Sequence, residues 1–160
     1  MDHFVSTHTN RIDAKGRVSV PASFRNILAK ESCEGVFCYP ALDEEALDAG
    51  GNRLIETIHS LLDNLNPYSD ERDHLATALF GVSEMLKLDA DGRVILSERL
   101  KVHAGIADAV TFVGLGYKFQ IWEPGRFEAY LAEGRDRLRE LKQLLGAARR
   151  SGAGPTGGRE

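Results

Sequence analysis

The stretch "RIDAKGRVSVPASF", residues 11–24, decides the fold, because a close relative of it, "KLDADGRVILSERL", recurs at residues 87–100. An internal repeat of this kind is typical of two copies of one supersecondary unit that complete a core by pairing. A single hairpin is only marginally stable, so we expect each copy to need the other. With residue i placed over residue i + 76, five identities align: Asp13 with Asp89, Ala14 with Ala90, Gly16 with Gly92, Arg17 with Arg93 and Val18 with Val94.

The first copy is predicted to be a β-hairpin followed by a short helix. "NRID" and "GRVSV" alternate polar with apolar residues, which is the period of a half-buried strand, and "DAKG" between them supplies turn residues. Pro21 fits the first turn of a helix over "PASFRNILAK", and a strand "GVFCY" follows. The side chains expected to point inward are Ile12, Val18 and Val20, and those expected to point outward are Arg11, Asp13, Arg17 and Ser19.

The rest of the chain repeats this plan around a helical segment. Residues 43–81 are predicted to form a helical hairpin that breaks at Asn66 and Pro67 and keeps its acidic side in water. Its apolar stripe, interrupted by Gly50 and Gly51, comprises Leu47, Leu54, Ile55, Ile58, Leu61, Leu62 and Leu65. The second copy predicts a strand "EMLKLD", a turn "ADG", a strand "RVILS" and a helix "SERLKVHA", followed by strands "AVTFVGL" and "YKFQIWE" and a long helix from Pro124.

The net charge of −4 is unevenly distributed, which bears on the partners of the chain. Residues 43–91 carry 12 acidic and 3 basic side chains, whereas residues 92–160 carry 8 acidic and 12 basic ones. A multivalent assembly can therefore present a basic face, and the overall charge does not exclude DNA as a partner. No apolar run approaches the roughly 20 residues needed to cross a bilayer, and the N-terminus has no secretory pattern, so we expect a cytoplasmic protein.

No motif indicates a metal, a cofactor or catalysis. Cys33 and Cys38 lie in the apolar stretch "CEGVFC" and are expected to be two buried thiols. The segment "GLGYKF" lacks the third glycine of a dinucleotide loop, "GVSEM" is not a nucleophile elbow, and Glu44 and Glu45 are typical of a solvated helix face. We therefore expect no enzyme. The histidines lack metal-ligand spacing: His3, His8, His59, His74 and His103.

Asp13 and Arg17 stand at the two ends of the first turn. A carboxylate there can hold a guanidinium by a bidentate, charge-assisted contact and fix its planar fork in space, which preorganises the arginine for guanine or phosphate. The alternative is a simple turn staple, because an exposed ion pair contributes only about 0–1 kcal/mol. The second copy retains both residues, and each copy has a basic outward neighbour, Arg11 or Lys87, which favours a surface presented to a partner.

The motif "DAKGRVSVP" resembles the signature of the SpoVT-AbrB swapped-hairpin DNA-binding domains, and two such motifs in a chain of this length are similar to the MraZ family. "TNRIDAKGRVSVPASFR" and "VTFVGLGYKFQIWEP" carry the likeness, which covers nearly all of residues 5–145. It implies an α+β fold in which two tandem swapped-hairpin β units form a pseudo-symmetric double-psi-like barrel, with a helical hairpin insertion and a long C-terminal helix. The implied domains are a first repeat (5–42), a helical linker (43–81), a second repeat (82–124), a C-terminal helix (125–146) and a disordered tail (147–160).

The resemblance also implies a function. It implies a transcriptional regulator of the bacterial cell division and cell wall gene cluster, which assembles as a ring of subunits, often an octamer, and binds short direct repeats of double-stranded DNA in its own promoter. Such a protein is cytoplasmic and nucleoid-associated, without a membrane partner or a cofactor. The family's site falls on the Asp and Arg of each motif, and the expected DNA-binding set is Arg11, Asp13, Lys15, Arg17, Lys87, Asp89 and Arg93.

The second copy departs from the family pattern at three positions. Asp91 stands where the first copy has the basic tip Lys15, Ile95 replaces the outward Ser19, and Ser97 replaces the proline that commonly ends the motif. Phosphate repels an acidic tip, and an outward isoleucine prefers contact with protein to a wet groove. We therefore expect the first copy to be the main DNA reader and the second mostly to complete the barrel.

Other roles stay open at this point. The swapped-hairpin fold also serves in antitoxin-like or scaffold modules that bind proteins, although such chains typically hold one motif copy and a disordered tail. The C-terminal segment is either a second phosphate-binding element or, as we prefer, a solvated helix face whose leucines pack on a neighbour. Its basic residues are Arg135, Arg137, Arg139, Lys142, Arg149 and Arg150, and its leucines are Leu138, Leu141, Leu144 and Leu145. Phe119 and Trp122 are expected in the core or in a subunit interface.

Overall fold

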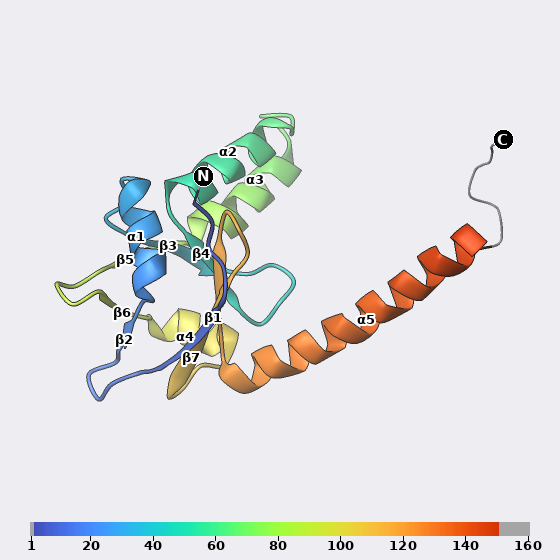
Figure 1. Ribbon diagram of the computed structural model, residues 1–160. Helices are drawn as coiled ribbons and strands as arrows, with labels where there is room; N and C mark the ends of the chain where they lie inside the picture. Colours follow the sequence, from blue (N-terminus) through green and yellow to red (C-terminus); the bar gives the residue numbers. More distant parts are fainter. Residues whose placement is uncertain (1, 151–160) are drawn as a thin grey trace. The chain divides into compact units, whose positions relative to one another are not determined.

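The computed structural model describes residues 2–150 and has two units, one ending at Pro124 and the other beginning at Gly125 (Figure 1). Helices and antiparallel strands are mixed, and a long helix, α5 (Pro124–Arg150), ends the described chain, as the sequence predicted. The other elements are β1 (Thr7–Arg11), β2 (Arg17–Ser19), α1 (Ala22–Lys30), β3 (Gly35–Pro40), β4 (Leu47–Gly50), α2 (Asn52–Asp63), α3 (Asp70–Ala76), the π-helical turn η1 (Thr77–Gly81), β5 (Glu84–Lys87), β6 (Arg93–Ile95), α4 (Glu98–Ala104), β7 (Ala109–Gly114) and β8 (Phe119–Trp122).

Strand pairing connects the two copies of the motif. Six strands form an antiparallel sheet in the order β1-β7-β8-β4-β3-β5, and β2 and β6 form a separate two-stranded ladder. The first strand of each copy lies against a later strand of the other, because β1 pairs with β7 and β5 pairs with β3. The two strands of the predicted first hairpin, β1 and β2, are joined by their turn but form no ladder with each other. Instead, β2 pairs with β6, with Val18 opposite Val94. This pairing buries both valines, and each copy depends on the other for its ladder.

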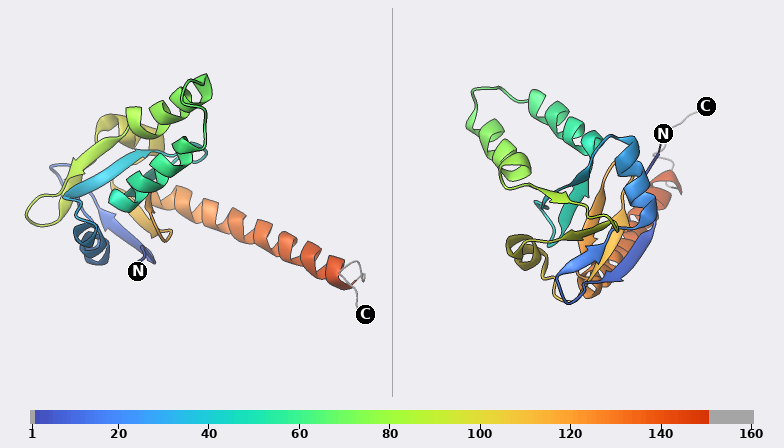
Figure 2. Two further views of the ribbon diagram at one scale, coloured as in Figure 1. Left: turned by 90° about the horizontal axis from the view of Figure 1, so that it is seen from above. Right: turned by 90° about the vertical axis from the view of Figure 1, so that its left-hand side faces the viewer.

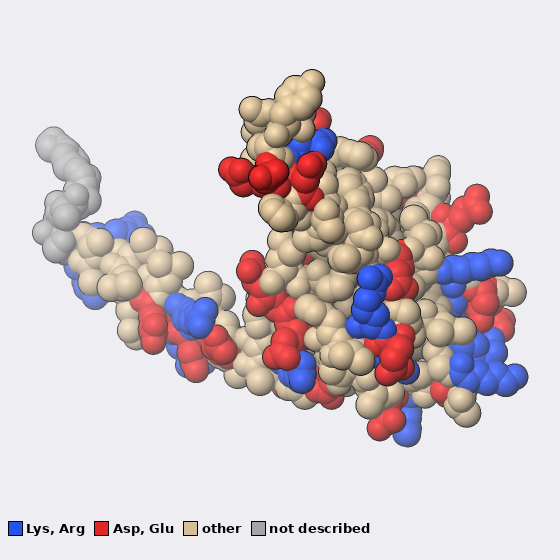
Figure 3. Space-filling model, turned by 180° about the vertical axis from the view of Figure 1, so that it is seen from behind, with Lys and Arg blue, Asp and Glu red and all other residues tan. Residues whose placement is uncertain are grey.

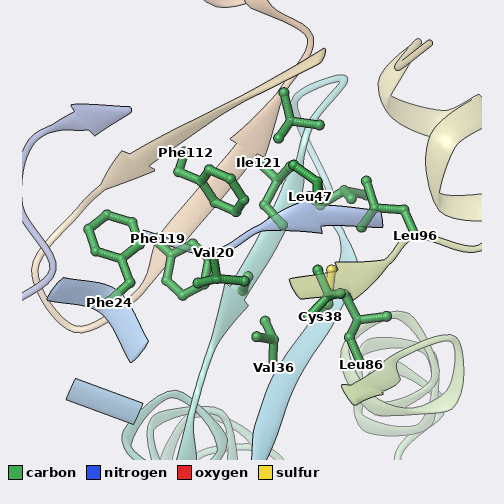
Figure 4. Packing of buried hydrophobic residues seen from close by; sticks show 14 of the residues in the cluster. Val20, Phe24, Val36, Cys38, Leu47, Leu86, Leu96, Phe112, Phe119 and Ile121 are labelled. Atoms are coloured by element: carbon green, nitrogen blue, oxygen red, sulfur yellow. The ribbon is translucent and has the colours of Figure 1, made fainter. Parts of the chain in front are cut away.

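A core of aromatic and branched side chains fills the space between the two copies (Figure 4). Val18 and Val20 are each 1% exposed, and Ile12 is partly buried against the same cluster, so the predicted inward face of the first hairpin is confirmed. Phe24 of α1 is fully buried, with its ring centroid 5.2 Å from that of Phe4 and 4.9 Å from that of Phe119. Phe119, which was expected in the core or in a subunit interface, therefore lies in the core of a single chain.

The prediction of a helix through residues 43–51 was wrong. Residues Leu47–Gly50 form β4, which pairs with β3 on one side and β8 on the other. Leu47 and Ala49 face the main core, and Asp48 between them points to the other face of the strand, where it is also buried. Leu47 also fitted the helical spacing of the leucines that follow, and four residues are too few to separate the two periods.

The helical hairpin itself begins after this strand. In Figure 2, α2 and α3 lie side by side next to β3 and β4. Phe37 and Tyr39 of β3 form a second buried cluster with Leu54, Ile58 and Leu62 of α2. Ser69 caps α3 by accepting a hydrogen bond from the Arg72 backbone N–H, which matches the start predicted near Ser69.

A buried polar network joins β4 to β8. The Asp48 carboxylate accepts hydrogen bonds from Lys118 Nζ at 3.0 Å and from Gln120 Nε2 at 2.8 Å. Burial lowers the pKa of Lys118, but the charge and hydrogen bond of Asp48 outweigh burial and raise it overall. Lys118 therefore stays charged, and the network holds β4 against β8.

Three further features complete the fold. Cys33 and Cys38 are free and buried, as predicted. Helix α5 continues to Arg150, so residues 147–150 of the predicted disordered tail are helical; its residues 151–160 lie outside the described residues. None of the helices in residues 2–150 has the length and apolar character required to cross a membrane.

Candidate nucleic-acid interface

The first turn, residues 13–17, is organised by the side chain of Asp13. Its Oδ1 accepts hydrogen bonds from the backbone N–H groups of Lys15 and Arg17, each at 2.9 Å, and its Oδ2 accepts one from Arg17 Nε at 2.8 Å. Gly16 closes the turn at φ +83°, a conformation that favours glycine. The expected bidentate fork to the carboxylate does not form: only Nε of the guanidinium donates, because Oδ1 is taken by the backbone.

That geometry leaves the outer end of Arg17 available. Within residues 2–150, no hydrogen bond or ion pair involves its two Nη groups. The Nε contact fixes the plane of the guanidinium, and the Arg17 side chain keeps 29% of its surface exposed. Arg17 is therefore oriented by the protein while its two terminal amino groups point to no protein acceptor in the described chain.

The second turn, residues 89–93, has the same backbone pattern but a different charge environment. Asp89 Oδ1 accepts from the Asp91 and Arg93 N–H groups at 2.9 Å, and Oδ2 accepts from Arg93 Nε at 3.0 Å. Arg93 Nη2 also donates to Asp91 at 3.2 Å, and its Nη1 lies 3.8 Å from Asp13 Oδ2. Three carboxylates thus surround Arg93, whereas one holds Arg17.

The backbone N–H groups also set the ionisation of the two turn carboxylates. The hydrogen bond from the Arg17 N–H is the largest cause that holds the pKa of Asp13 below its usual range. The Arg93 N–H has the same leading effect on the pKa of Asp89. Both groups are therefore charged at neutral pH and keep their hold on the arginines.

The two turns are joined by contacts that the sequence did not predict. The Val20 N–H donates to the Gly92 carbonyl at 3.0 Å, and Arg25 Nε of α1 donates to the Val20 carbonyl at 3.0 Å. Gly92, at φ +78°, lies so close to Arg25 that a Cβ atom would come 2.5 Å from the Arg25 side chain. In the i + 76 alignment, Lys101 of the second copy is equivalent to Arg25. A basic residue at this position in both copies was the one sequence signal that could have pointed to Arg25.

The remaining predicted residues lie at the ends of the strands. Arg11 is the last residue of β1 and Lys87 the last of β5, while Lys15 sits at the tip of the first turn, and all three are exposed. Of the expected set, the structure brings together Asp13, Arg17, Asp89 and Arg93. In the described chain, no ion pair links Arg11, Lys15 or Lys87 to an acidic group. Figure 3 shows Lys and Arg side chains gathered at the edge of the molecule on which the turns lie, with acidic side chains among them.

One of the departures in the second copy, Ser97, has a structural reason, and another, Ile95, lies beside Arg17. Ser97 caps α4 by accepting from the Leu100 N–H at 3.3 Å, and its hydroxyl donates to Glu84 at 2.8 Å. The serine thus replaces the helix-starting proline by a different capping device. Ile95 is 58% exposed and stands opposite Arg17 in the β2–β6 ladder.

The Cys38 thiol and the acidic and histidine side chains bear on whether the chain holds groups suited to nucleophilic or metal chemistry. Burial raises the pKa of the Cys38 thiol far above its usual value, which leaves it protonated. Within residues 2–150, no group of three or more His, Cys, Asp or Glu side chains is arranged to hold a metal ion. The turns themselves offer fixed cations and hydrogen-bond donors.

The fold and the site define a mixed helix and strand protein with two copies of one turn motif, joined by the β2–β6 ladder, each of which holds an arginine by an aspartate. A family model described as "MraZ protein, putative antitoxin-like" matches residues 79–143. A transcriptional regulator MraZ from Xanthobacter autotrophicus is 58% identical over 147 residues, covering 92% of this chain and 94% of its own length. A protein of the same name from Azorhizobium caulinodans is 55% identical and covers 98% of this chain and 98% of its own length. Another, from Rickettsia bellii, is 44% identical and covers 85% of this chain and 91% of its own length. The chain belongs to the MraZ family.

Proposed function

We propose that this chain is a sequence-specific DNA-binding transcriptional regulator that recognises direct repeats in its own promoter, upstream of the cell division and cell wall gene cluster. The observation that carries the proposal is Arg17, whose guanidinium is held by Asp13 through Nε while its Nη groups have no partner in the described chain. The name of its relatives, transcriptional regulators rather than enzymes, supports the same role.

Arg17 has the chemistry to read a base edge. A guanidinium that offers two parallel N–H groups recognises the O6 and N7 atoms of guanine in the major groove, with a discrimination of about 1–3 kcal/mol. Lys15 at the tip of the first turn and Arg11 at the end of β1 are both exposed, and in this proposal they contact the flanking phosphates. Phosphate contacts fix the register of the protein on the duplex, and the arginine supplies the sequence preference.

The second hairpin contributes less in this proposal. Asp91 takes one amino group of Arg93, and its exposed carboxylate stands where the first turn has Lys15. An acidic tip is repelled by the phosphate backbone. Of the expected DNA-binding residues of the second copy, Asp89 and Arg93 therefore act mainly by supporting the first turn, to which Arg93 is linked through Asp13. Lys87, exposed at the end of β5, contributes a phosphate contact in this proposal.

The architecture suits a multivalent reader. We take the crossed pairings of β1 with β7, β5 with β3 and β2 with β6 as support for a pseudo-symmetric, swapped-hairpin barrel of the double-psi-like kind, with repeats at 5–42 and 82–124. Copies in a ring, such as an octamer in the cytoplasm at the nucleoid, would engage repeated DNA elements together. The exposed leucines of α5 would pack on a neighbouring subunit: Leu138, Leu141, Leu144 and Leu145.

A second candidate is an antitoxin-like or scaffold module, which the wording of the family model favours. In that case the exposed leucines of α5 would cover a protein toxin instead of another subunit. Purification from native cells separates the two: a stoichiometric small protein that copurifies and is lost with Leu141→Ser would favour the antitoxin role. The same leucine change affecting only subunit number would favour the ring.

Fluorescence anisotropy tests the DNA-binding proposal directly. Purified protein is titrated with a labelled duplex from upstream of its own gene and with a scrambled duplex, each at two salt concentrations, and Arg17→Ala is measured in parallel. We expect tight, salt-sensitive binding that prefers the upstream duplex and is lost in Arg17→Ala. Equal binding to both duplexes, or binding that survives the substitution, would contradict the proposal.

A further inference from the structure

The two-stranded ladder of β2 and β6 presents a small, ordered set of side chains on its outer face. Arg17 stands opposite Ile95, and Ser19 stands opposite Arg93. Val18 and Val94, the residues between them, are each 1% exposed and form the inner face. Alternation along the strands therefore places the four other residues on one outward face.

Three of these four residues are polar, and the fourth is an exposed branched hydrocarbon. Ile95 keeps 58% of its surface exposed in a position where its equivalent in the first copy is Ser19. Directly opposite residues of an antiparallel pair have Cβ atoms about 4.5–5.5 Å apart, so Ile95 lies beside the base of the Arg17 side chain. A partner that contacts Arg17 on this face thus also meets an exposed apolar group next to the base of its side chain.

The size of this ladder matches a DNA groove. The major groove of B-DNA admits a two-stranded antiparallel ribbon, whose outward side chains then face the base edges. In that groove, guanine offers acceptors to an arginine, and thymine offers the one apolar group, its 5-methyl, which proteins read by apolar contact. An arginine beside an isoleucine is a matched pair of probes for these two groups.

We propose that Ile95 reads the 5-methyl group of a thymine next to the base read by Arg17, so that the second copy contributes a specificity contact of its own. The inference rests on the proposed DNA-binding function and corrects the expectation that an outward isoleucine avoids the groove. It assigns to Ile95 an apolar contact worth about one buried methyl group, which corresponds to roughly fourfold in affinity per contact.

The same residue gives the ribbon a direction. A ladder whose two strands were identical would read a site equally well in either orientation. The second copy has Ile95 where the first has Ser19, and Asp91 where the first has Lys15. These differences make the two ends of the ladder unequal, so each subunit prefers one orientation on the duplex. Subunits that all face one way along DNA require direct repeats, which agrees with the proposed promoter target.

Replacement of thymine by deoxyuridine isolates the methyl group. The duplex from upstream of the gene is prepared with thymidine and with deoxyuridine throughout, which needs no knowledge of the operator. Wild-type protein is expected to bind the deoxyuridine duplex about fourfold or more weakly. Ile95→Ser should bind both duplexes equally, Ile95→Val should keep most of the difference, and Val102→Ser, an exposed change on α4 outside the ladder, should keep all of it.

The outcomes separate this inference from the proposed function. If wild-type protein binds both duplexes equally while Arg17→Ala still abolishes binding, Ile95 reads no methyl group although the DNA-binding function stands. If Ile95→Ser keeps the full preference for the thymidine duplex, another residue reads the methyl group. If Ile95→Ser changes subunit number by light scattering and leaves the preference intact, Ile95 belongs to a protein interface. Each of these results overturns the inference.

Discussion

The two turns share one scaffold and differ in where the charge of the arginine goes. In each, an aspartate binds two backbone N–H groups with one oxygen and the arginine Nε with the other. Arg17 then has no further acidic neighbour in the described chain, whereas Arg93 also meets Asp91 and Asp13. The shared part of the motif therefore builds the turn, and the residue at the tip decides whether its arginine is offered outward or neutralised.

Support for the fold should be equal in the two copies even though their surfaces differ. Phe24 and its equivalent Leu100 are both fully buried. We expect Phe24→Ala to destabilise the protein by about 3–5 kcal/mol and Leu100→Ala by about 2–5 kcal/mol, because each leaves a cavity in the shared core. Chemical denaturation followed by circular dichroism should give one transition for each variant. Two separate transitions would mean that the copies fold independently.

Glycine at the turns should tolerate change less in the second copy than in the first. Gly16 and Gly92 both have positive φ, so an alanine at either costs about 1–2 kcal/mol. A Cβ at Gly16 meets nothing within 4 Å, whereas one at Gly92 collides with Arg25. Thermal melts should therefore show a larger loss for Gly92→Ala than for Gly16→Ala. A similar loss in both would indicate that Arg25 moves aside easily.

Reversing the charge at the second tip should make the second turn resemble the first. Asp91→Lys removes one partner of Arg93 and supplies the cation that Lys15 supplies in the first copy. We expect tighter binding to the upstream duplex. The slope of log affinity against log salt concentration should steepen by about one unit for every subunit whose residues 89–93 contact DNA. Glu56→Lys, the same charge change on exposed α2, is the control and should leave the slope nearly unchanged. Equal effects of the two changes would assign the gain to net charge alone.

Acid should release both turns only below the usual range of aspartate. The pKa values of Asp13 and Asp89 are lowered by their backbone hydrogen bonds, so their stabilising effect is present above the ordinary aspartate pKa and lost as pH falls through the lowered values. Carboxyl carbon NMR titrations should place both midpoints below about 3.9. A midpoint at or above that value for either residue would show that its hydrogen bonds do not persist in solution.

Local pattern predicted much of this molecule because much of it is locally determined. The repeated turn, the inward valines and the helix after Pro21 follow from period and turn chemistry within a few residues of each other. Asp13 and Arg17 were found for the same reason, since the contact spans only four residues. Arg11, Lys15 and Lys87 were placed correctly on exposed strand ends and a turn tip, and their contacts with DNA stay predictions.

What the sequence missed depends on partners distant along the chain. The strand β4 was hidden because Asp48, which reads as a solvated helix residue, is buried by its contact with Lys118, 70 positions away. The pairing of β2 with β6 and the contact between Arg93 and Asp13 link residues of different copies. Hydrophobic period says which face of a strand is buried but not which strand lies beside it.

Arginine-to-lysine changes at the two turns test the unequal roles most directly. Lysine keeps the positive charge and loses the planar fork that binds a base edge. In the anisotropy assay, Arg17→Lys should retain salt-sensitive binding and lose the preference for the upstream duplex over the scrambled one. Arg93→Lys should keep most of that preference. Equal loss of preference in both variants, or a greater loss in Arg93→Lys, would contradict a division of labour set by the residue at each tip.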